Sequence, residues 1–269
     1  MTTVRHPAVA GRFYPARPEV LMRDVQSYLV ASGEKIQAIG CVVPHAGYMY
    51  SGHVAGAVYA RLTLPERIII LCPNHTGMGK PLAVMTEGRW DTPLGEAEID
   101  HQLATELRDV FSSLSEDSIA HHAEHALEVQ LPFIQILQRK FTFVPIAVGV
   151  GSYAPLTSLG EALAHVVSAH NQRILIIASS DMNHYESDTV TRVKDHHAIE
   201  QILKLDPQGL FDVVVNEDIS MCGYGPTVAM LTAAKRLGAE SAELIKYATS
   251  ADVSGDRETV VGYAGVIVH

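Results

Sequence analysis

Three histidines follow apolar segments of the chain, where their side chains could act on a ligand. His45 lies in VVPHAGYMYSG of residues 42–52, His75 lies in PNHTGMG, and His184 follows Asp181 in SSDMNHY. Histidine is the commonest metal ligand in proteins and the usual acid–base group near neutral pH. A single histidine after a strand is more often structural. Three of them predict a shared site, because a metal needs several ligands at fixed separations.

A cysteine is the fourth candidate. Cys222 stands in SMCGYGPTVAM, directly before a predicted helix and beside glycines that let the backbone approach a ligand closely. The positive end of a helix dipole lowers the pKa of a thiol and so favours the thiolate, which binds metals and attacks electrophiles. The alternative is a small buried apolar residue, which we expect of Cys41 and Cys72 inside their strands.

The segment HHAEHALEVQ carries a competing pattern. His121, Glu124 and His125 match H-x-x-E-H, the inverted motif of certain zinc peptidases. Such a match arises easily by chance in a chain with 14 histidines. We expect instead that His125 and Glu128, three residues apart on one helical face, line the same site as the histidines that follow the strands.

Two further patterns are interpreted structurally. Residues 149–154, GVGSYA, match G-x-G-x-x-A, but no acidic residue follows at the expected distance, so we predict a tight turn from strand to helix. His196 and His197 lie in a charged, helix-like stretch, which indicates a face exposed to solvent.

The elements that must position these residues alternate along the chain. Short apolar runs rich in Ile and Val predict buried strands at residues 36–44, 67–73, 141–149 and 173–180, and a last strand within 258–269. Apolar residues at helical spacing predict helices at residues 98–112, 124–140 with a kink at Pro132, 155–170 and 227–237.

This alternation predicts one α/β domain over residues 1–269, with a central, largely parallel or mixed sheet covered by helices. Ligands of such sheets bind where the carboxyl ends of the strands meet the following loops. His45, His75 and His184 are predicted at that edge, which is why we expect them to share a site.

Composition narrows the classes of partner. Hydrophobic residues make up 47% of the 269 residues and charged residues 19%, which is typical of a globular protein with a sizeable core. A formal net charge of −10 without a basic block argues against nucleic acid and anionic membranes as partners. The N-terminal residues lack the apolar core of a signal peptide, and three scattered cysteines do not indicate a disulfide framework. We therefore expect a cytoplasmic protein.

The motifs, taken in order, resemble those of one family. RHPAVAGRFYP, VVPHAGYMYSG, CPNHTG, the Glu-His pair of AEHALEVQLPF, SSDMNHY and the Cys-Gly-Tyr-Gly turn resemble the Memo family, and they extend over essentially the whole chain. That family comprises the eukaryotic mediator of cell motility and its microbial relatives. Its fold is similar to that of class III extradiol dioxygenases, which open a catechol ring with O₂ at an Fe(II) held by two histidines and a glutamate.

The resemblance implies a ligand set. His45 and His75 take the two histidine positions, and Cys222 takes the third, which is a carboxylate in the dioxygenases. A thiolate is softer than a carboxylate, and this changes the preference among Fe, Cu and Zn. We expect iron as the metal, with copper or zinc as alternatives.

The resemblance also implies the groups around the metal. His184 corresponds to the acid–base histidine, with Asp181 beside it, and His125 resembles a second histidine of the same site. Tyr48 and Tyr50 are expected to line the entrance.

We expect a metal-dependent oxidoreductase related to the dioxygenases, acting on a small molecule or peptide. One alternative is a binding module that holds a peptide or small ligand at the same site without turning it over. Another is a hydrolase in which Cys222 is the nucleophile and His184 the base.

Overall fold

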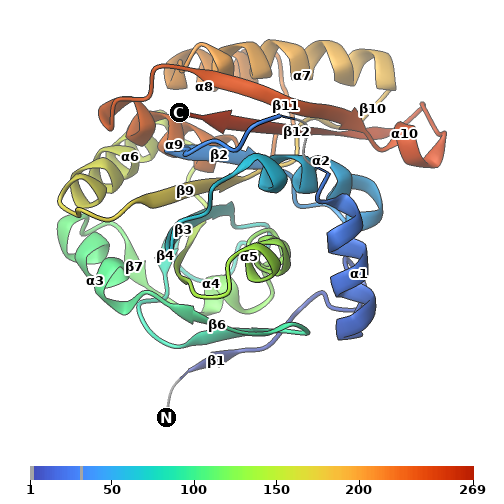
Figure 1. The fold of residues 1–269 in the computed structure, drawn as a ribbon. Helices are drawn as coiled ribbons and strands as arrows, with labels where there is room; N and C mark the ends of the chain where they lie inside the picture. The colour runs from blue at the N-terminus through green and yellow to red at the C-terminus, as the bar shows by residue number, and fades with distance from the viewer. Residues whose placement is uncertain (1–2, 31–32) are drawn as a thin grey trace.

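The computed structural model describes residues 3–30 and 33–269 (Figure 1). Its strands are β1 (Val4–Arg5), β2 (Gly40–Val43), β3 (Arg67–Pro73), β4 (Leu82–Val84), β5 (Arg89–Thr92), β6 (Gly95–Ile99), β7 (Ser115–Glu116), β8 (Thr142–Val148), β9 (Ile174–Ser179), β10 (His184–Glu186), β11 (Ala242–Thr249) and β12 (Val260–Val268).

The helices are α1 (Pro18–Tyr28), α2 (Tyr48–Arg61), α3 (His101–Val110), α4 (Ile119–His122), α5 (Leu131–Leu137), α6 (Tyr153–Ser168), α7 (Asp188–Leu203), α8 (Pro207–Asn216), α9 (Tyr224–Arg236) and α10 (Ala251–Ser254), with a 3₁₀ turn η1 (Glu128–Gln130) before α5. None of the helices in the described part of the chain is both long and apolar enough to cross a membrane.

All twelve strands belong to one mixed sheet, in the order β1-β5-β6-β8-β3-β9-β2-β12-β10, with β4 beside β8, β7 beside β4 and β11 beside β12. The central strands β8, β3, β9 and β2 are parallel. Their side chains are almost all buried, which suits strands covered on both faces. Antiparallel pairing joins β2 to β12 and β12 to β10 and β11. The predicted fold class is confirmed.

Helices cover the two faces of this sheet (Figure 1). On one face α2 packs against β11, β12 and β2, and α1 and α5 pack against α2. On the other face α9 packs against β9, β2 and β3, with α6 and α8 outside it. The core is therefore divided by the sheet, and the loops after the parallel strands emerge between the two helical layers.

The predicted strands agree with the observed ones within a few residues. The segment at 67–73 is β3, and those at 141–149 and 173–180 are β8 and β9, each slightly shortened. The segment at 36–44 is shortened to β2, because Ile36 pairs with Leu62 in an isolated bridge outside the main ladder. The last predicted strand is β12.

Two predicted helices were wrong in part. The helix predicted at 98–112 begins only at His101, because Glu98 and Ile99 belong to β6 and pair with β8. Asp100 ends that strand and starts the helix, since its carboxylate accepts a hydrogen bond from the Leu103 backbone N–H.

The helix predicted at 124–140 is shorter still. Residues 123–127 form no regular helix, η1 follows at Glu128, and α5 covers only Leu131–Leu137. Pro132 therefore stands in the first turn of α5 and does not kink a longer helix. A proline is tolerated there because a first-turn N–H has no partner within the helix.

The segment after His45 forms a helix that was not predicted, since α2 begins at Tyr48. The short strands β4 to β7 and β10 were not predicted, since two to five residues carry too little periodicity.

Close packing of α1 on α2 requires a glycine, and this gives a first prediction. A Cβ added at Gly56 would overlap the backbone carbonyl of Tyr28. Gly→Ala inside a helix usually stabilises a protein by about 0.5–1 kcal/mol. We expect Gly56→Ala to lower the free energy of unfolding by about 1–3 kcal/mol, because α1 must move away.

Urea unfolding of the purified protein measures this change. Ser158→Ala, at an exposed position of α6, is the control and should be neutral or slightly stabilising. An unchanged or raised stability of Gly56→Ala would contradict the packing described.

Candidate metal centre

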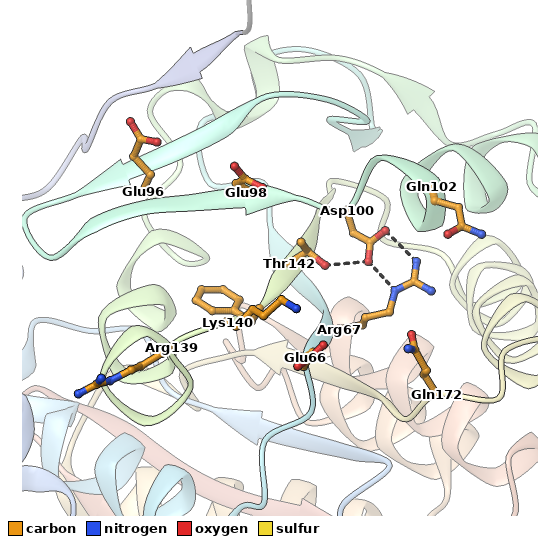
Figure 2. A pocket seen from close by; sticks show the side chains of 11 residues that line it. Glu66, Arg67, Glu96, Glu98, Asp100, Gln102, Arg139, Lys140, Thr142 and Gln172 are labelled. Atoms are coloured by element: carbon orange, nitrogen blue, oxygen red, sulfur yellow. Dashed lines mark hydrogen bonds and ion pairs between the residues drawn. The ribbon is translucent and has the colours of Figure 1, made fainter.

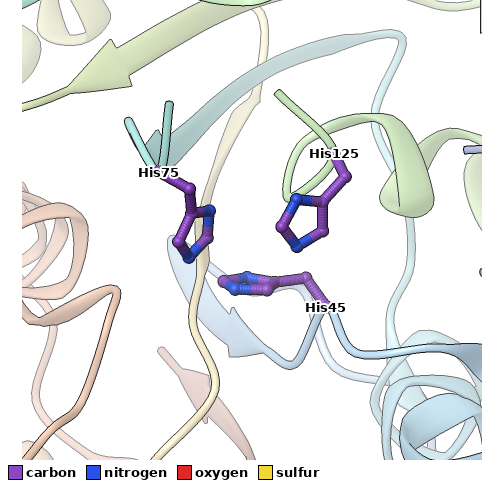
Figure 3. Close-up of side chains that lie close together, drawn as sticks. All are labelled: His45, His75 and His125. Carbon is purple, nitrogen blue, oxygen red and sulfur yellow. The ribbon is translucent and has the colours of Figure 1, made fainter. Parts of the chain in front are cut away.

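Parallel strands deliver the candidate side chains to one edge of the sheet. His45 stands two residues after the end of β2, His75 two residues after β3 and Asp181 two residues after β9. Because β9 pairs with both β2 and β3, the three strands end side by side. His125 reaches the same place from the irregular segment before η1 (Figure 3).

Three imidazole rings converge at this edge. One ring nitrogen from each of His45, His75 and His125 lies within 4.8 Å of the others. The rings of His75 and His125 are stacked at a centroid distance of 4.8 Å, and the His45 ring meets both edge-on at 5.2 and 5.5 Å. Such a set of nitrogens could hold a metal ion.

The hydrogen bonds of Ser179 determine which nitrogen of His45 carries its proton. The Ser179 hydroxyl must donate to the Ala126 carbonyl at 2.6 Å, since a carbonyl can only accept. It therefore accepts from His45 Nδ1 at 3.0 Å. With its proton on Nδ1, His45 presents the lone pair of Nε2 to the site.

Gln130 completes this arrangement from behind. Its amide nitrogen donates to the Pro44 carbonyl at 3.0 Å and to Ser179 Oγ at 2.9 Å. Its amide oxygen accepts from the Tyr59 hydroxyl at 2.9 Å. Every side chain in this series of hydrogen bonds is buried and has a partner. The orientation of His45 is therefore held by the protein itself.

Glu124 does the same for His75. Its carboxylate accepts from the His75 backbone N–H at 2.6 Å, from His75 Nδ1 at 2.9 Å and from the Ala126 N–H at 2.9 Å. Burial by itself would raise the pKa of Glu124, but these hydrogen bonds hold it at about 2. An ionised carboxylate can only accept, so the His75 proton lies on Nδ1 and Nε2 is free. Carboxylate-to-histidine bonds of this kind commonly orient metal ligands.

The surroundings keep the imidazoles of His45 and His125 neutral. Burial lowers the pKa of His45 well below its ordinary value, and the neighbouring His75 acts in the same direction. Burial, followed by the effect of His45, lowers the pKa of His125 to about 4. Neutral imidazole is the form that binds metals. The side chains of His75 and His125 remain 32% and 22% exposed, so the site is reachable from solvent.

Cys222 lies next to His45. Its Sγ stands 3.2 Å from His45 Nε2 and 3.7 Å from the Asp181 carbonyl oxygen. Nε2 and the carbonyl oxygen can both accept, so they compete for the single thiol proton. Burial and the Asp181 carboxylate raise the pKa of Cys222, although the residue directly precedes the N-cap of α9. The lowered pKa expected from the helix N-terminus is therefore wrong.

Asp181 follows β9, and His184 begins β10 and is not one of the three clustered histidines. Asp181 Oδ1 accepts from the backbone N–H of His45 at 2.7 Å and of Ala46 at 3.3 Å, and burial raises the pKa of this carboxyl. His184 Nδ1 donates to the Ser220 carbonyl at 2.9 Å. The His184 backbone N–H donates to Ser220 Oγ at 2.7 Å. His184 Nε2 is therefore the nitrogen left to accept a proton.

One expectation about the segment around residue 125 was wrong. Glu128 does not line the site with His125. It is buried against the N-terminal segment, pairs with Arg5, and accepts from the Tyr14 hydroxyl at 2.5 Å. The cause is the absence of a helix at residues 123–127, which removes the shared face.

The zinc-peptidase pattern is not assembled either. His121 lies in the four-residue helix α4, which ends before His125. Its buried ring packs edge-on against Trp90 at 5.7 Å, and burial lowers its pKa to about 4. His121 and His125 therefore do not share a helical face.

The expectation that Tyr48 lines the entrance was wrong, because Tyr48 is buried and its hydroxyl donates to the Val129 carbonyl at 2.6 Å. Tyr50 stays partly exposed and packs against the small cluster of Val54, Ala248 and Tyr263. His197 lies on an exposed part of α7 and pairs with Glu217 at 2.7 Å.

Sequence reasoning missed the groups that orient the ligands. Glu124 was considered only as part of a peptidase motif and of the family motif with His125, and no orienting role was assigned to it. Ser179 and Gln130 had no signal, because a serine at a strand end and a glutamine before a helix are common. Their importance depends on which carbonyls lie within reach.

A separate cavity of about 610 Å³ lies at the opposite end of β3 and β8 (Figure 2). It is lined mainly by charged side chains and contains no histidine or cysteine. Asp100 closes part of it by accepting from Arg67 Nε at 2.6 Å and Nη2 at 2.8 Å. This cavity is distant from the histidine cluster and takes no part in it.

Comparisons with a family model and with individual sequences indicate the same family. The sequence model described as Memo-like protein matches residues 5–267. A MEMO1 family protein of Methanosarcina barkeri is 43% identical over 267 residues, which cover 98% of this chain and 100% of the relative. A MEMO1 family protein of Methanocaldococcus jannaschii is 43% identical over 287 residues and covers 100% of both chains.

A solved structure is similar in fold. The crystal structure of an uncharacterized protein from Escherichia coli K12 matches with a TM-score of 0.56 and 12% sequence identity, over 86% of this chain and 100% of that chain. At this identity the similarity concerns the arrangement of the sheet and helices alone.

The lowered pKa of Glu124 gives a second prediction. Its folded-state pKa of about 2 lies below the ordinary 4.5, so its ionised form stabilises the fold above pH 4.5. This stabilisation is lost as the pH falls toward 2. The stability difference between the wild type and Glu124→Gln should shrink by about 2 kcal/mol between pH 6 and pH 3.

Urea unfolding of chelator-treated protein at the two pH values measures this difference. Glu258→Gln, which replaces an exposed carboxylate, should show no comparable pH dependence relative to the wild type. A constant difference between the wild type and Glu124→Gln would mean that Glu124 is not held ionised by His75.

Proposed function

Because this chain belongs to the Memo family, we propose that it works through one transition-metal ion bound by His45 and His75, with Cys222 and His125 as the donors that complete the coordination. The observation that carries this proposal is the convergence of three imidazole nitrogens within 4.8 Å. The lone pairs of His45 and His75 are already directed into the site by Ser179 and Glu124.

The donor set supports iron, with copper or zinc as alternatives. Imidazole binds Fe, Cu and Zn, and a thiolate is a soft, electron-donating ligand. Cys222 would bind the metal as the thiolate and release its proton to solvent, since its Sγ lies 3.2 Å from His45 Nε2, whose lone pair is proposed to bind the same ion. The raised pKa of the thiol makes metal binding depend on pH, with affinity rising as the pH rises.

We propose an oxidoreductase that uses O₂, in keeping with the resemblance to extradiol dioxygenases. When bound, the metal would supply a redox-active Lewis acid with a position open to O₂ or substrate. His184 would accept a proton at Nε2 while Ser220 holds its other nitrogen. Asp181 would orient His45 through the backbone. The substrate class we propose is a small molecule or a peptide.

A second candidate is a Cys–His hydrolase. It is favoured by the 3.2 Å contact of Cys222 Sγ with His45 Nε2, which is within reach for a nucleophile and its base. The base would then be His45, in place of the predicted His184. Burial opposes this candidate, because it raises the pKa of the thiol and disfavours the nucleophilic thiolate.

Metal binding to single variants is the third prediction. Anaerobic titration with Co(II) should give one equivalent in the wild type, with a sulfur-to-metal charge-transfer band in the ultraviolet. Cys222→Ser should lose that band, and His125→Ala should keep it while binding more weakly. His45→Ala should bind at least tenfold more weakly.

The same proteins separate the two candidates. With Fe(II), nitric oxide should bind the wild type and give an electron paramagnetic resonance signal that His45→Ala lacks. Equal metal binding in the wild type and His45→Ala would overturn the metal proposal. Rapid alkylation of Cys222 at pH 7, unaffected by added metal, would favour the hydrolase.

Ser179 gives a fourth prediction. Ser179→Ala removes the acceptor that directs the His45 proton to Nδ1, so the tautomer with a free lone pair on Nε2 is no longer favoured. We expect about tenfold weaker Co(II) binding and a loss of about 1–3 kcal/mol in stability. The control is Ser158→Ala, whose side chain is exposed on α6. Unchanged affinity in Ser179→Ala would contradict the assigned tautomer.

A further inference from the structure

Arg5 is a buried cation far along the chain from the candidate metal ligands, yet all three of its guanidinium nitrogens bind residues 121–128. Nε donates to the His121 carbonyl at 3.1 Å, and Nη2 donates to the Glu124 carbonyl at 2.7 Å. Nη1 pairs with the Glu128 carboxylate. Only 4% of Arg5 is exposed, so solvent does not compete for these bonds.

The segment that Arg5 holds is the one that completes the metal site. The backbone carbonyl of Glu124 is bound by Arg5, while the Glu124 carboxylate binds His75 at its backbone N–H and at Nδ1. The next residue, His125, contributes a ring nitrogen to the cluster. One residue therefore connects the guanidinium to the orientation of two of the three imidazoles.

This segment has little regular structure to hold it otherwise. Helix α4 ends at His122 and η1 begins at Glu128, so residues 123–127 have no helical ladder. Their backbone position depends on bonds to other parts of the chain. The carbonyl of Ala126 is bound by Ser179, and the carbonyl of Glu124 by Arg5.

Arg5 is itself fixed on its other side. It belongs to β1, which pairs with β5, and its guanidinium lies over the Trp90 ring at 4.3 Å. Glu128 is fixed too, because it accepts from the Ala8 and Val9 backbone N–H groups at 2.8 and 3.1 Å. The N-terminal segment is thus a rigid support for residues 121–128.

We infer that Arg5 is a positioning residue for the metal site, which acts by fixing the backbone that presents Glu124 and His125. This inference rests on the proposed metal function. Arg5 does not touch the metal or a ligand. By fixing the distance between the His75 and His125 rings, Arg5 affects how tightly the site binds a metal and how the ligands are arranged around it.

Arg5→Lys tests this role while keeping a positive charge beside Glu128. An ammonium group cannot bind two carbonyls and a carboxylate in the planar geometry of a guanidinium. We expect Arg5→Lys to fold, to bind Co(II) about tenfold more weakly, and to show an altered ligand-field spectrum of bound Co(II). In metal-free protein, amide hydrogen exchange of residues 121–128 should become faster.

Arg67→Lys is the matched control. Arg67 is also a largely buried arginine, and its guanidinium donates two hydrogen bonds to the Asp100 carboxylate. It lies at the other end of β3. We expect this variant to lose thermal stability while its Co(II) affinity and spectrum stay those of the wild type. General loss of stability is thereby separated from an effect on the site.

The outcomes distinguish this inference from the proposed function. Arg5→Lys could lose stability as Arg67→Lys does and still bind Co(II) with the affinity and spectrum of the wild type. That result would overturn the inference and leave the metal proposal standing. Absence of Co(II) binding to the wild type would overturn the metal proposal, and unchanged hydrogen exchange of residues 121–128 would still overturn the inference. Should Arg5→Lys not fold, Tyr14→Phe removes one bond to Glu128 and should weaken binding by a smaller factor; unchanged binding there would overturn the inference.

Discussion

The parallel pairing of β2, β9 and β3 is the constraint on which the site depends. Val43 of β2 is paired with Ser179 of β9, and Leu71 of β3 is paired with Ala178, so the three strands end at the same edge of the sheet. Whatever follows them within two residues is held close together on a rigid support. His45 and His75 are such residues, and the loops beyond them emerge where both helical layers leave the edge open.

The direction of the hydrogen bonds then determines which ring nitrogens of His45 and His75 are free to bind a ligand. Groups that can only accept, such as the Ala126 carbonyl and the ionised Glu124, force the protons of His45 and His75 onto Nδ1. Both Nε2 lone pairs are thereby free, and burial keeps His45 neutral. The single proton of the Cys222 thiol lies between two acceptors, His45 Nε2 and the Asp181 carbonyl oxygen.

Sequence patterns predicted the parts of the molecule that are locally encoded. Buried strands such as β3 were placed within a residue or two because continuous apolar runs have few other stable forms. The order of the motifs along the chain was enough to identify the Memo family. The prediction of a helix over residues 124–140 was wrong because Pro132 and the contacts of Glu124 outweigh the helical periodicity of the apolar residues. Glu128 was misplaced for the same reason, since a helical spacing has meaning only where a helix forms.

By itself, the sequence determined the fold class, the family and the convergence of His45 and His75, because strand ends and residue types are local properties of the chain. Only the tertiary structure decided which groups orient those histidines and that Glu128, unlike His125, lies away from them. Ser179 meets Ala126 across 53 residues and Arg5 meets Glu124 across 119, and no local pattern records contacts at such separations. Burial, which sets whether the Cys222 thiol keeps its proton, is likewise a property of the assembled core.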